Sequence, residues 1–243
     1  MTPHLAQKRP GAAFPRRPIP GRYGARAGLV NRRRGISSTL FLLLALLLPR
    51  AAAVAAPVKI LAFGDSLTAG YGVMPEQAFP ARLQARLVAH GIAAEVVNGG
   101  VSGDTTADGV ARLDWALADR PDIVLVELGA NDALRGIDPK LTYANLDKIL
   151  TRFQASGAKV MLLGMLAPAN WGREYQQEFA AIYPDLAKRH DVALYPFFLD
   201  GVATDPALNQ PDGLHPNARG AEIIADKIAP LVARLVQERG EPG

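Results

Sequence analysis

Residues 58–72 read Val58-Lys59-Ile60-Leu61-Ala62-Phe63-Gly64-Asp65-Ser66-Leu67-Thr68-Ala69-Gly70-Tyr71-Gly72, an apolar run that passes directly into a glycine-flanked serine. A short apolar run bounded by glycine predicts a buried strand, and ligands of open α/β sheets bind at the carboxyl ends of such strands. Glycines on both sides let the backbone turn sharply and let a substrate approach closely. Ser66 is therefore a candidate nucleophile, provided that a histidine reaches its hydroxyl.

Apolar stretches alternate with amphipathic stretches along the rest of the chain. We expect strands at 58–63, 94–98, 122–128, 159–165 and 192–196, and helices at 79–90, 105–118, 141–156, 173–190 and 217–238. Strands this apolar, each followed by a helix, are typical of a parallel sheet covered on both faces. The sequence predicts an α/β fold, a three-layer α/β/α sandwich whose five-stranded parallel sheet has a flavodoxin-like strand order.

Four histidines are available, and His215 is the candidate base. His4 lies in a basic leader, while His90 and His190 each close a helical pattern, where polar caps are common. His215 instead follows Asp212 by three residues, in a loop punctuated by glycine and proline. An imidazole can take a serine proton while a carboxylate holds its tautomer. An Asp and a His at this spacing are usually surface residues, so the combination with Ser66 is what indicates a triad.

Two glycine-rich strand ends supply candidate donors for an oxyanion. Residues 94–105 pass from a strand into several glycines, where a bare backbone amide at Gly103 or Gly100 can point at the site. Residues 122–132 end in the same way and deliver the side-chain amide of Asn131. Taken singly, each segment also fits a simple turn or a helix cap.

These blocks together resemble the GDSL or SGNH hydrolases, a family named after a Ser, a Gly, an Asn and a His from separate sequence blocks. The resemblance runs from residue 58 to the final helix. Residues 126–136, 168–173 and 182–188 look most like the small bacterial branch that contains thioesterase I, lysophospholipase and arylesterase. Gly129-Ala130-Asn131 stands where the family frequently has Gly-Gly-Asn.

The resemblance implies the SGNH hydrolase fold and a role for each residue. Ser66 attacks the acyl carbon, His215 moves the proton and Asp212 orients His215, so that an acyl-enzyme forms and water releases the acid. The backbone amides of Ser66 and Gly103, with the Asn131 side chain, form the oxyanion hole. We expect no cofactor and no metal.

Two segments that follow strand ends on this side of the sheet are candidate walls for an acyl chain, residues 133–138 and 166–172. By resemblance, the first acts as a mobile flap. The candidate substrate-binding residues are Leu67, Leu134, Ile137, Pro168, Asn170 and Trp171. We expect acyl esters, thioesters or lysophospholipids as substrates, and a carbohydrate O-acetyl esterase is the alternative.

Two readings from other classes stay open at this point. A metal-dependent hydrolase would use Asp65, Asp104, Asp132, Asp212 and His215, although a single histidine is few for a zinc site. We expect Asp65 instead to fix the turn beside Ser66. A non-catalytic flavodoxin-like binding module, for example for a nucleotide, would lack both the Gly-x-Gly-x-x-Gly turn and a Gly-Lys-Ser or Gly-Lys-Thr phosphate loop.

Residues 1–56 form a basic leader that ends in a signal-peptide pattern. Arg32-Arg33-Arg34 precede the apolar run 40–48, and the small residues 51–56 offer cleavage sites after Ala53 or Ala55. This predicts export to the periplasm or beyond, with no membrane anchor after cleavage. Residues 1–29 are long and proline-rich for a signal peptide, so they are a disordered extension or translation begins near Val30.

Charge and cysteine content bound the remaining domain, residues 57–243. Ten of the 27 Lys and Arg residues lie before residue 57, where no acidic residue occurs, which leaves 17 basic against 23 acidic side chains and a formal charge of −6. This acidic balance gives no support to nucleic-acid binding. The absence of cysteine excludes a thiol nucleophile and disulfides. We expect one domain, a monomer acting on a small molecule.

Overall fold

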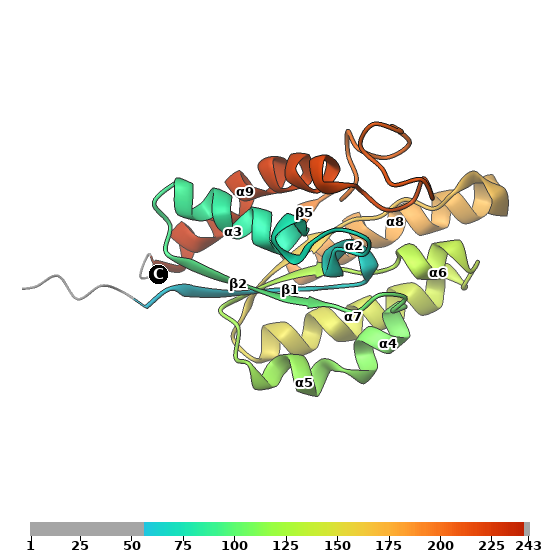
Figure 1. The fold of residues 1–243 in the computed structure, drawn as a ribbon. Coiled ribbons are helices and arrows are strands. Elements are labelled where there is room, and N and C mark those ends of the chain that lie inside the picture. Colours follow the sequence, from blue (N-terminus) through green and yellow to red (C-terminus); the bar gives the residue numbers. More distant parts are fainter. Residues whose placement is uncertain (1–55, 241–243) are drawn as a thin grey trace, which may run out of the picture. The chain divides into compact units, whose positions relative to one another are not determined.

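Five parallel strands form one sheet in the computed structural model, which describes residues 56–240 (Figure 1). They are β1 (Val58–Gly64), β2 (Ala94–Gly100), β3 (Ile123–Glu127), β4 (Lys159–Leu163) and β5 (Ala193–Tyr195). The order β2-β1-β3-β4-β5 is the flavodoxin-like order, as predicted. Gly64 pairs with Gly100 on one side and with Glu127 on the other, so the ends of β1, β2 and β3 lie level.

Helices cover both faces of this sheet, which confirms the three-layer sandwich. On one face lie α3 (Phe79–Ala89) and α9 (Ala218–Gly240), packed against each other. On the opposite face lie α4 (Thr106–Ala111), α5 (Leu113–Ala118) and α7 (Pro139–Ala155), with α8 (Arg173–His190) packed beside α7 (Figure 1). The short helices α2 (Ser66–Ala69), η2 (Pro75–Gln77), α6 (Ala130–Leu134) and η3 (Ala169–Trp171) lie in the loops.

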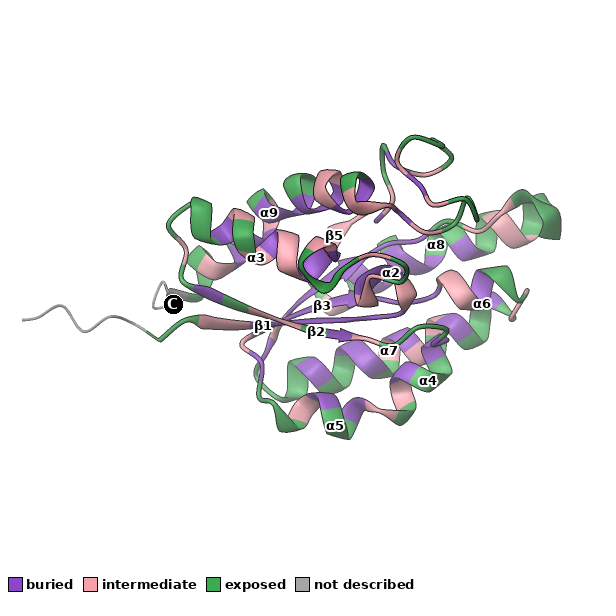
Figure 2. Cartoon of the chain, in the orientation of Figure 1, coloured by how far each residue is buried: buried purple, intermediate pink, exposed green. Residues whose placement is uncertain are grey.

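The central strands are buried on both faces, as their uninterrupted apolar sequence predicts (Figure 2). Every residue of β3 is buried, and Phe63 of β1 packs edge-on against Phe153 of α7, with ring centroids 5.1 Å apart. The loops at the strand ends are therefore anchored to a closely packed, rigid sheet. Within residues 56–240, no helix combines the length and the hydropathy needed to cross a bilayer.

One expected element was wrong: the helix predicted over 105–118 is two helices, α4 and α5. They are separated at Arg112, whose backbone leaves the helical region at φ −104° and ψ 12°. Its guanidinium bonds to the ends of β1 and β2, and the helical periodicity of the sequence does not predict these contacts. The other predicted strands and helices agree with the structure to within two residues at each end. The leader predicted over residues 1–56 lies outside the described residues except for Ala56.

Candidate active site

Ser66 is the first residue of α2, directly after the end of β1. The side chain of Asp65 caps this helix by accepting a hydrogen bond from the Leu67 amide at 2.9 Å. A Cβ on Gly64 would lie 2.1 Å from Thr68 Oγ1 and 2.6 Å from the Glu127 carbonyl oxygen, so only glycine fits at the turn. The strand-to-helix turn thus presents the Ser66 hydroxyl at the carboxyl edge of the sheet.

His215 meets Ser66 across 149 residues of sequence: its Nε2 lies 2.9 Å from Ser66 Oγ. On the other side of the ring, Nδ1 lies 2.7 Å from Asp212 Oδ2. An ionised Asp212 accepts a hydrogen bond from the Nδ1–H of His215, which leaves Nε2 free to accept a hydrogen bond from the hydroxyl. The three side chains form one chain of contacts, serine to imidazole to carboxylate.

Asp212 is held as a carboxylate by its own loop. Its Oδ1 accepts hydrogen bonds from the backbone amides of His215 at 3.0 Å and Leu214 at 2.9 Å. These bonds, together with that from the His215 ring, lower the pKa of Asp212 from 3.8 to about 2. The spacing of three residues therefore builds the carboxylate and the imidazole into a single turn.

The His215 loop is fastened to the loop after α2. The Gln210 amide donates to the His215 carbonyl oxygen at 2.8 Å, and Gln210 Nε2 donates to the carbonyl oxygens of Tyr71 at 2.6 Å and Pro216 at 3.0 Å. The Tyr71 ring lies over the imidazole, with centroids 4.7 Å apart. The position of His215 relative to Ser66 is thus set by direct contacts between the two loops.

The two backbone amides predicted for the oxyanion hole are those of Ser66 and Gly103. Neither the Ser66 N–H nor the Gly103 N–H has an acceptor among residues 56–240. Gly103 has φ +89°, a conformation that favours glycine, and its carbonyl oxygen accepts a hydrogen bond from Arg135 Nη2 at 2.9 Å. Asn131 is already engaged: its Nδ2 donates to Asp65 Oδ2 at 3.2 Å and to the Asp104 carbonyl oxygen at 3.0 Å.

Two buried carboxyl groups, Asp65 and Glu127, lie behind the nucleophile. Glu127 Oε2 accepts hydrogen bonds from Thr68 Oγ1 at 2.8 Å and from the Asp65 amide at 3.4 Å. Burial raises the pKa of Glu127 well above its ordinary value, and its Oε1 has no hydrogen-bond partner within residues 56–240. Burial also raises the pKa of Asp65 from 3.8 to about 6. Asp65 is therefore ionised only above mildly acidic pH.

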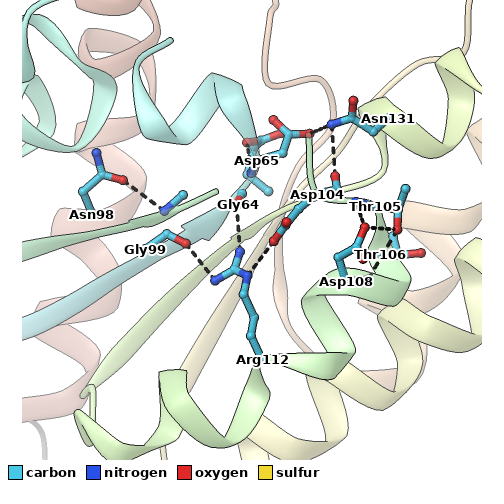
Figure 3. A network of polar contacts seen from close by, with 12 residues as sticks. Gly64, Asp65, Asn98, Gly99, Asp104, Thr105, Thr106, Asp108, Arg112 and Asn131 are labelled. Carbon is cyan, nitrogen blue, oxygen red and sulfur yellow. Dashed lines mark hydrogen bonds and ion pairs between the residues drawn. The ribbon is translucent and has the colours of Figure 1, made fainter. Parts of the chain in front are cut away.

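Arg112 ties together the strand ends that carry these groups (Figure 3). Its guanidinium pairs with Asp104 at 2.6 Å and donates to the carbonyl oxygens of Gly64 at 2.8 Å and Gly99 at 2.9 Å. It also lies 3.9 Å above the Phe63 ring. Arg112 thereby satisfies carbonyl groups at the ends of both β1 and β2, next to the turn that carries the serine.

The predicted acyl walls are one continuous surface. Trp171 Nε1 donates to the Ala133 carbonyl oxygen at 2.8 Å, and the Trp171 ring packs so closely on Gly136 that a Cβ there would approach it to 2.8 Å. Leu134 and Trp171 are about half exposed. Of the remaining candidate substrate-binding residues, Leu67 is buried, Ile137 and Pro168 are half-buried, and Asn170 is exposed.

The acidic residues considered for a metal site are otherwise engaged. Asp104 pairs with Arg112, and Asp132 accepts hydrogen bonds from both Thr106 and Thr142 side chains. No group of three or more His, Asp or Glu side chains in residues 56–240 is arranged to hold a metal ion. The donor set at this edge suits proton transfer and hydrogen bonding.

Residues 62–223 match the model of the GDSL-like lipase/acylhydrolase family. The chain belongs to this family. It is 45% identical over 179 residues to an arylesterase of Vibrio mimicus, an alignment that covers 73% of this chain and 90% of the relative. It is 44% identical over 197 residues to thioesterase 1/protease 1/lysophospholipase L1 of Escherichia coli K12, covering 81% and 92%.

The fold agrees with solved structures of the same kind. The crystal structure of AlinE4, an SGNH-hydrolase family esterase, superposes with a TM-score of 0.64 at 45% identity, covering 76% of this chain and 99% of that one. The family assignment made from the sequence is thereby confirmed. Several contacts in this GDSL domain were still missed by sequence reasoning.

Tyr71, Gln210, Arg112 and Glu127 had no predicted role. Tyr71 stands between two glycines in the Ser66 block, and Gln210 lies two residues before Asp212, so proximity to the motifs was the available signal. The signal for Glu127 was an acidic residue at the end of an otherwise apolar strand. For these residues, the sequence indicates a position near the site but does not show which group each side chain contacts.

Proposed function

We propose that this chain is a serine hydrolase of acyl esters and thioesters that works through Ser66, His215 and Asp212. The observation that carries the proposal is the 2.9 Å contact between His215 Nε2 and Ser66 Oγ, backed by the 2.7 Å contact to Asp212. Membership of the GDSL-like lipase/acylhydrolase family supports the same reaction class.

Acylation follows from this geometry. As Ser66 Oγ attacks the acyl carbon, its proton moves to His215 Nε2, and Asp212 stabilises the imidazolium that forms. The proton then passes to the oxygen or sulfur of the leaving group as the ester or thioester bond breaks. The acyl group stays on Ser66, and water, activated by the same imidazole, releases the acid.

The negative charge on the acyl oxygen is stabilised by the Ser66 and Gly103 amides and by Asn131. The two backbone amides are free to donate. Asn131 must share one of its amide protons with the oxyanion, and the longer bond, 3.2 Å to Asp65, is the one that it gives up most easily. Asp65 is then a positioning residue for Asn131, in addition to capping α2.

Apolar surface beside the site and the names of the relatives support an acyl-chain substrate. Leu134 and Trp171 expose about half of their surface, and they lie in the segments that follow β3 and β4. The relatives are an arylesterase and a thioesterase/lysophospholipase. We therefore infer that a short to medium acyl chain lies against the joined segments 133–138 and 166–172, and that lysophospholipids are among the substrates.

Hydrolysis of p-nitrophenyl esters tests the mechanism. Ser66→Ala should lower kcat by about 10⁴-fold or more, while the matched control Ser156→Ala, at the far end of α7, should keep wild-type turnover. Turnover should also persist in EDTA, which separates this route from a metal-dependent one. Full activity of Ser66→Ala would refute the mechanism.

The acyl-chain profile tests the substrate class separately. Rates for p-nitrophenyl esters from acetyl to octanoyl should rise beyond acetyl, and Trp171→Ala should flatten that rise. A steady fall beyond acetyl would instead favour the carbohydrate O-acetyl esterase alternative, with the mechanism unaffected.

We also propose that the domain is exported and the leader removed. The basic residues, the apolar run 40–48 and the small residues 51–56 support this. N-terminal sequencing of the mature protein should find a start at Val54 or Ala56. A mature protein that retains the apolar run would contradict export with cleavage, and a precursor that contains residues 1–29 would refute the later start near Val30.

A further inference from the structure

An exposed aromatic ring lies against the catalytic imidazole. The centroids of Tyr71 and His215 are 4.7 Å apart, with the ring planes tilted by 42°. Tyr71 nevertheless keeps 54% of its surface exposed. The ring therefore covers part of the imidazole and still presents aromatic surface to a ligand.

The main chain fixes the place of this ring. The Tyr71 amide donates to the Ser66 carbonyl oxygen at 3.1 Å, and the Tyr71 carbonyl oxygen accepts from Gln210 Nε2 at 2.6 Å. Gly70 and Gly72 flank it at φ +81° and +74°. Because both peptide groups of Tyr71 are bonded to the loops of the nucleophile and the base, its ring is pre-organised beside them.

The chemistry of acylation places the leaving group on this side of Ser66. His215 Nε2 must come within about 3 Å of the leaving oxygen or sulfur to protonate it while the acyl group stays on Ser66 Oγ. The oxyanion donors Gly103 and Asn131 follow β2 and β3, whereas His215 belongs to the loop that leads into α9. The first atoms beyond the leaving oxygen thus lie next to the imidazole and to Tyr71.

The cavity that Tyr71 and His215 help to line is too small for a leaving group. The cavity lined by Ser66, Leu67, Tyr71, Phe79 and His215, among others, has a volume of about 10 Å³. That is at the threshold for one water molecule. A leaving group therefore cannot enter this cavity, whereas the exposed surface of Tyr71 is open to it.

We propose that Tyr71 is a specificity-determining residue that forms a leaving-group subsite for flat aromatic alcohols. This rests on the acyl-enzyme route proposed above. Aromatic groups pack against an exposed tyrosine ring in offset or edge-on geometry and gain more than aliphatic groups of similar size. The subsite contacts the leaving group, which departs when the acyl-enzyme forms. It therefore favours aryl over alkyl esters of the same acid in the acylation step.

The test compares phenyl butanoate with ethyl butanoate, which give the same butanoyl-enzyme. The ratio of their kcat/KM values reports leaving-group recognition, and the intrinsic reactivity of the two esters cancels between variants. Tyr71→Ala should lower the phenyl-to-ethyl ratio about 2- to 13-fold. Tyr71→Phe should keep the wild-type ratio, as should Trp115→Ala, which removes an exposed aromatic ring from α5 (63% exposed).

A wild-type ratio in Tyr71→Ala would overturn the proposal, and so would an equal loss for both esters, since Tyr71 would then only hold the imidazole. Tyr71→Leu, which keeps an apolar cover on His215, gives the same test should the alanine variant fold poorly. An unchanged ratio with turnover that still depends on Ser66 refutes the subsite alone. Turnover that survives Ser66→Ala refutes the acyl-enzyme route itself.

Discussion

Replacing Asp65 by asparagine should remove a pH-dependent loss of stability that begins in mild acid. Burial raises the pKa of Asp65 from 3.8 to about 6 in the folded state. The folded protein therefore holds this proton more tightly than the unfolded chain does. The contribution of this tighter proton binding to the free energy of unfolding is fully present below about pH 4 and is lost as the pH rises through about 6. A shift from 3.8 to about 6 corresponds to about 3 kcal/mol.

The substitution is chosen because it leaves the local structure largely intact. Asparagine still caps α2, since its side-chain oxygen can accept from the Leu67 amide. Its amide faces Asn131 where a carboxylate oxygen stood, which adds a cost that does not vary with pH. Burial, and after it the charge of Asp65, raises the pKa of Glu127 well above its ordinary value, and Glu127 is present in both proteins.

Urea unfolding from about pH 3.5 to about pH 7.5 measures the effect. The free energy of unfolding of the wild type, minus that of Asp65→Asn, should fall by about 3 kcal/mol across the window, most steeply between about pH 4 and about pH 6. Asp185→Asn, an exposed carboxylate on α8, serves as the control and should show no such fall. A flat difference, or one that rises with pH, would refute the assignment of a buried, proton-retaining Asp65.

Three further changes probe the remaining parts of the site. Asp212→Asn should lower kcat by about 10³- to 10⁴-fold, because the asparagine amide no longer fixes the His215 tautomer. Steady-state hydrolysis of a p-nitrophenyl ester measures this loss of kcat, and a loss below tenfold would argue against the role of Asp212. Gly103→Ala should cost about 1–2 kcal/mol of unfolding free energy, since φ is +89°, and urea titration that found no loss would contradict the strain. Arg112→Met leaves Asp104 and two carbonyl groups without their hydrogen-bond donor, and the side chains of Arg112 and Asp104 are only 15% and 12% exposed. The substitution should therefore cost about 2–4 kcal/mol of unfolding free energy in the same assay. A variant more stable than the wild type would contradict this reasoning.

The architecture was predictable because its signals are local. The apolar run 58–63 and the apolar stretch 122–128 specify buried strands, and the helix at 173–190 was placed at its observed ends. The Asp212–His215 contact followed from a spacing of three residues. The contact between Ser66 and His215 joins residues 149 positions apart, yet it could be anticipated, because parallel strands present their carboxyl ends at one edge of the sheet.

The contacts that were missed depend on which side chain turns toward which loop. Arg112 stands in an amphipathic stretch, where a cation is expected at the surface, yet its guanidinium donates to carbonyl oxygens at the ends of β1 and β2. Tyr71 packs on His215 only because loops from the two ends of the domain meet. The bond between Asn131 and Asp65 likewise joins side chains 66 residues apart, and no periodic pattern encodes it.

Covalent trapping tests most directly whether Ser66 and His215 act together as nucleophile and base. After treatment with diethyl p-nitrophenyl phosphate, peptide mass spectrometry should find one diethylphosphoryl adduct, on Ser66, and His215→Ala should slow its formation by at least about 100-fold. An adduct on another residue, or labelling of Ser66 at the wild-type rate in His215→Ala, would contradict the account.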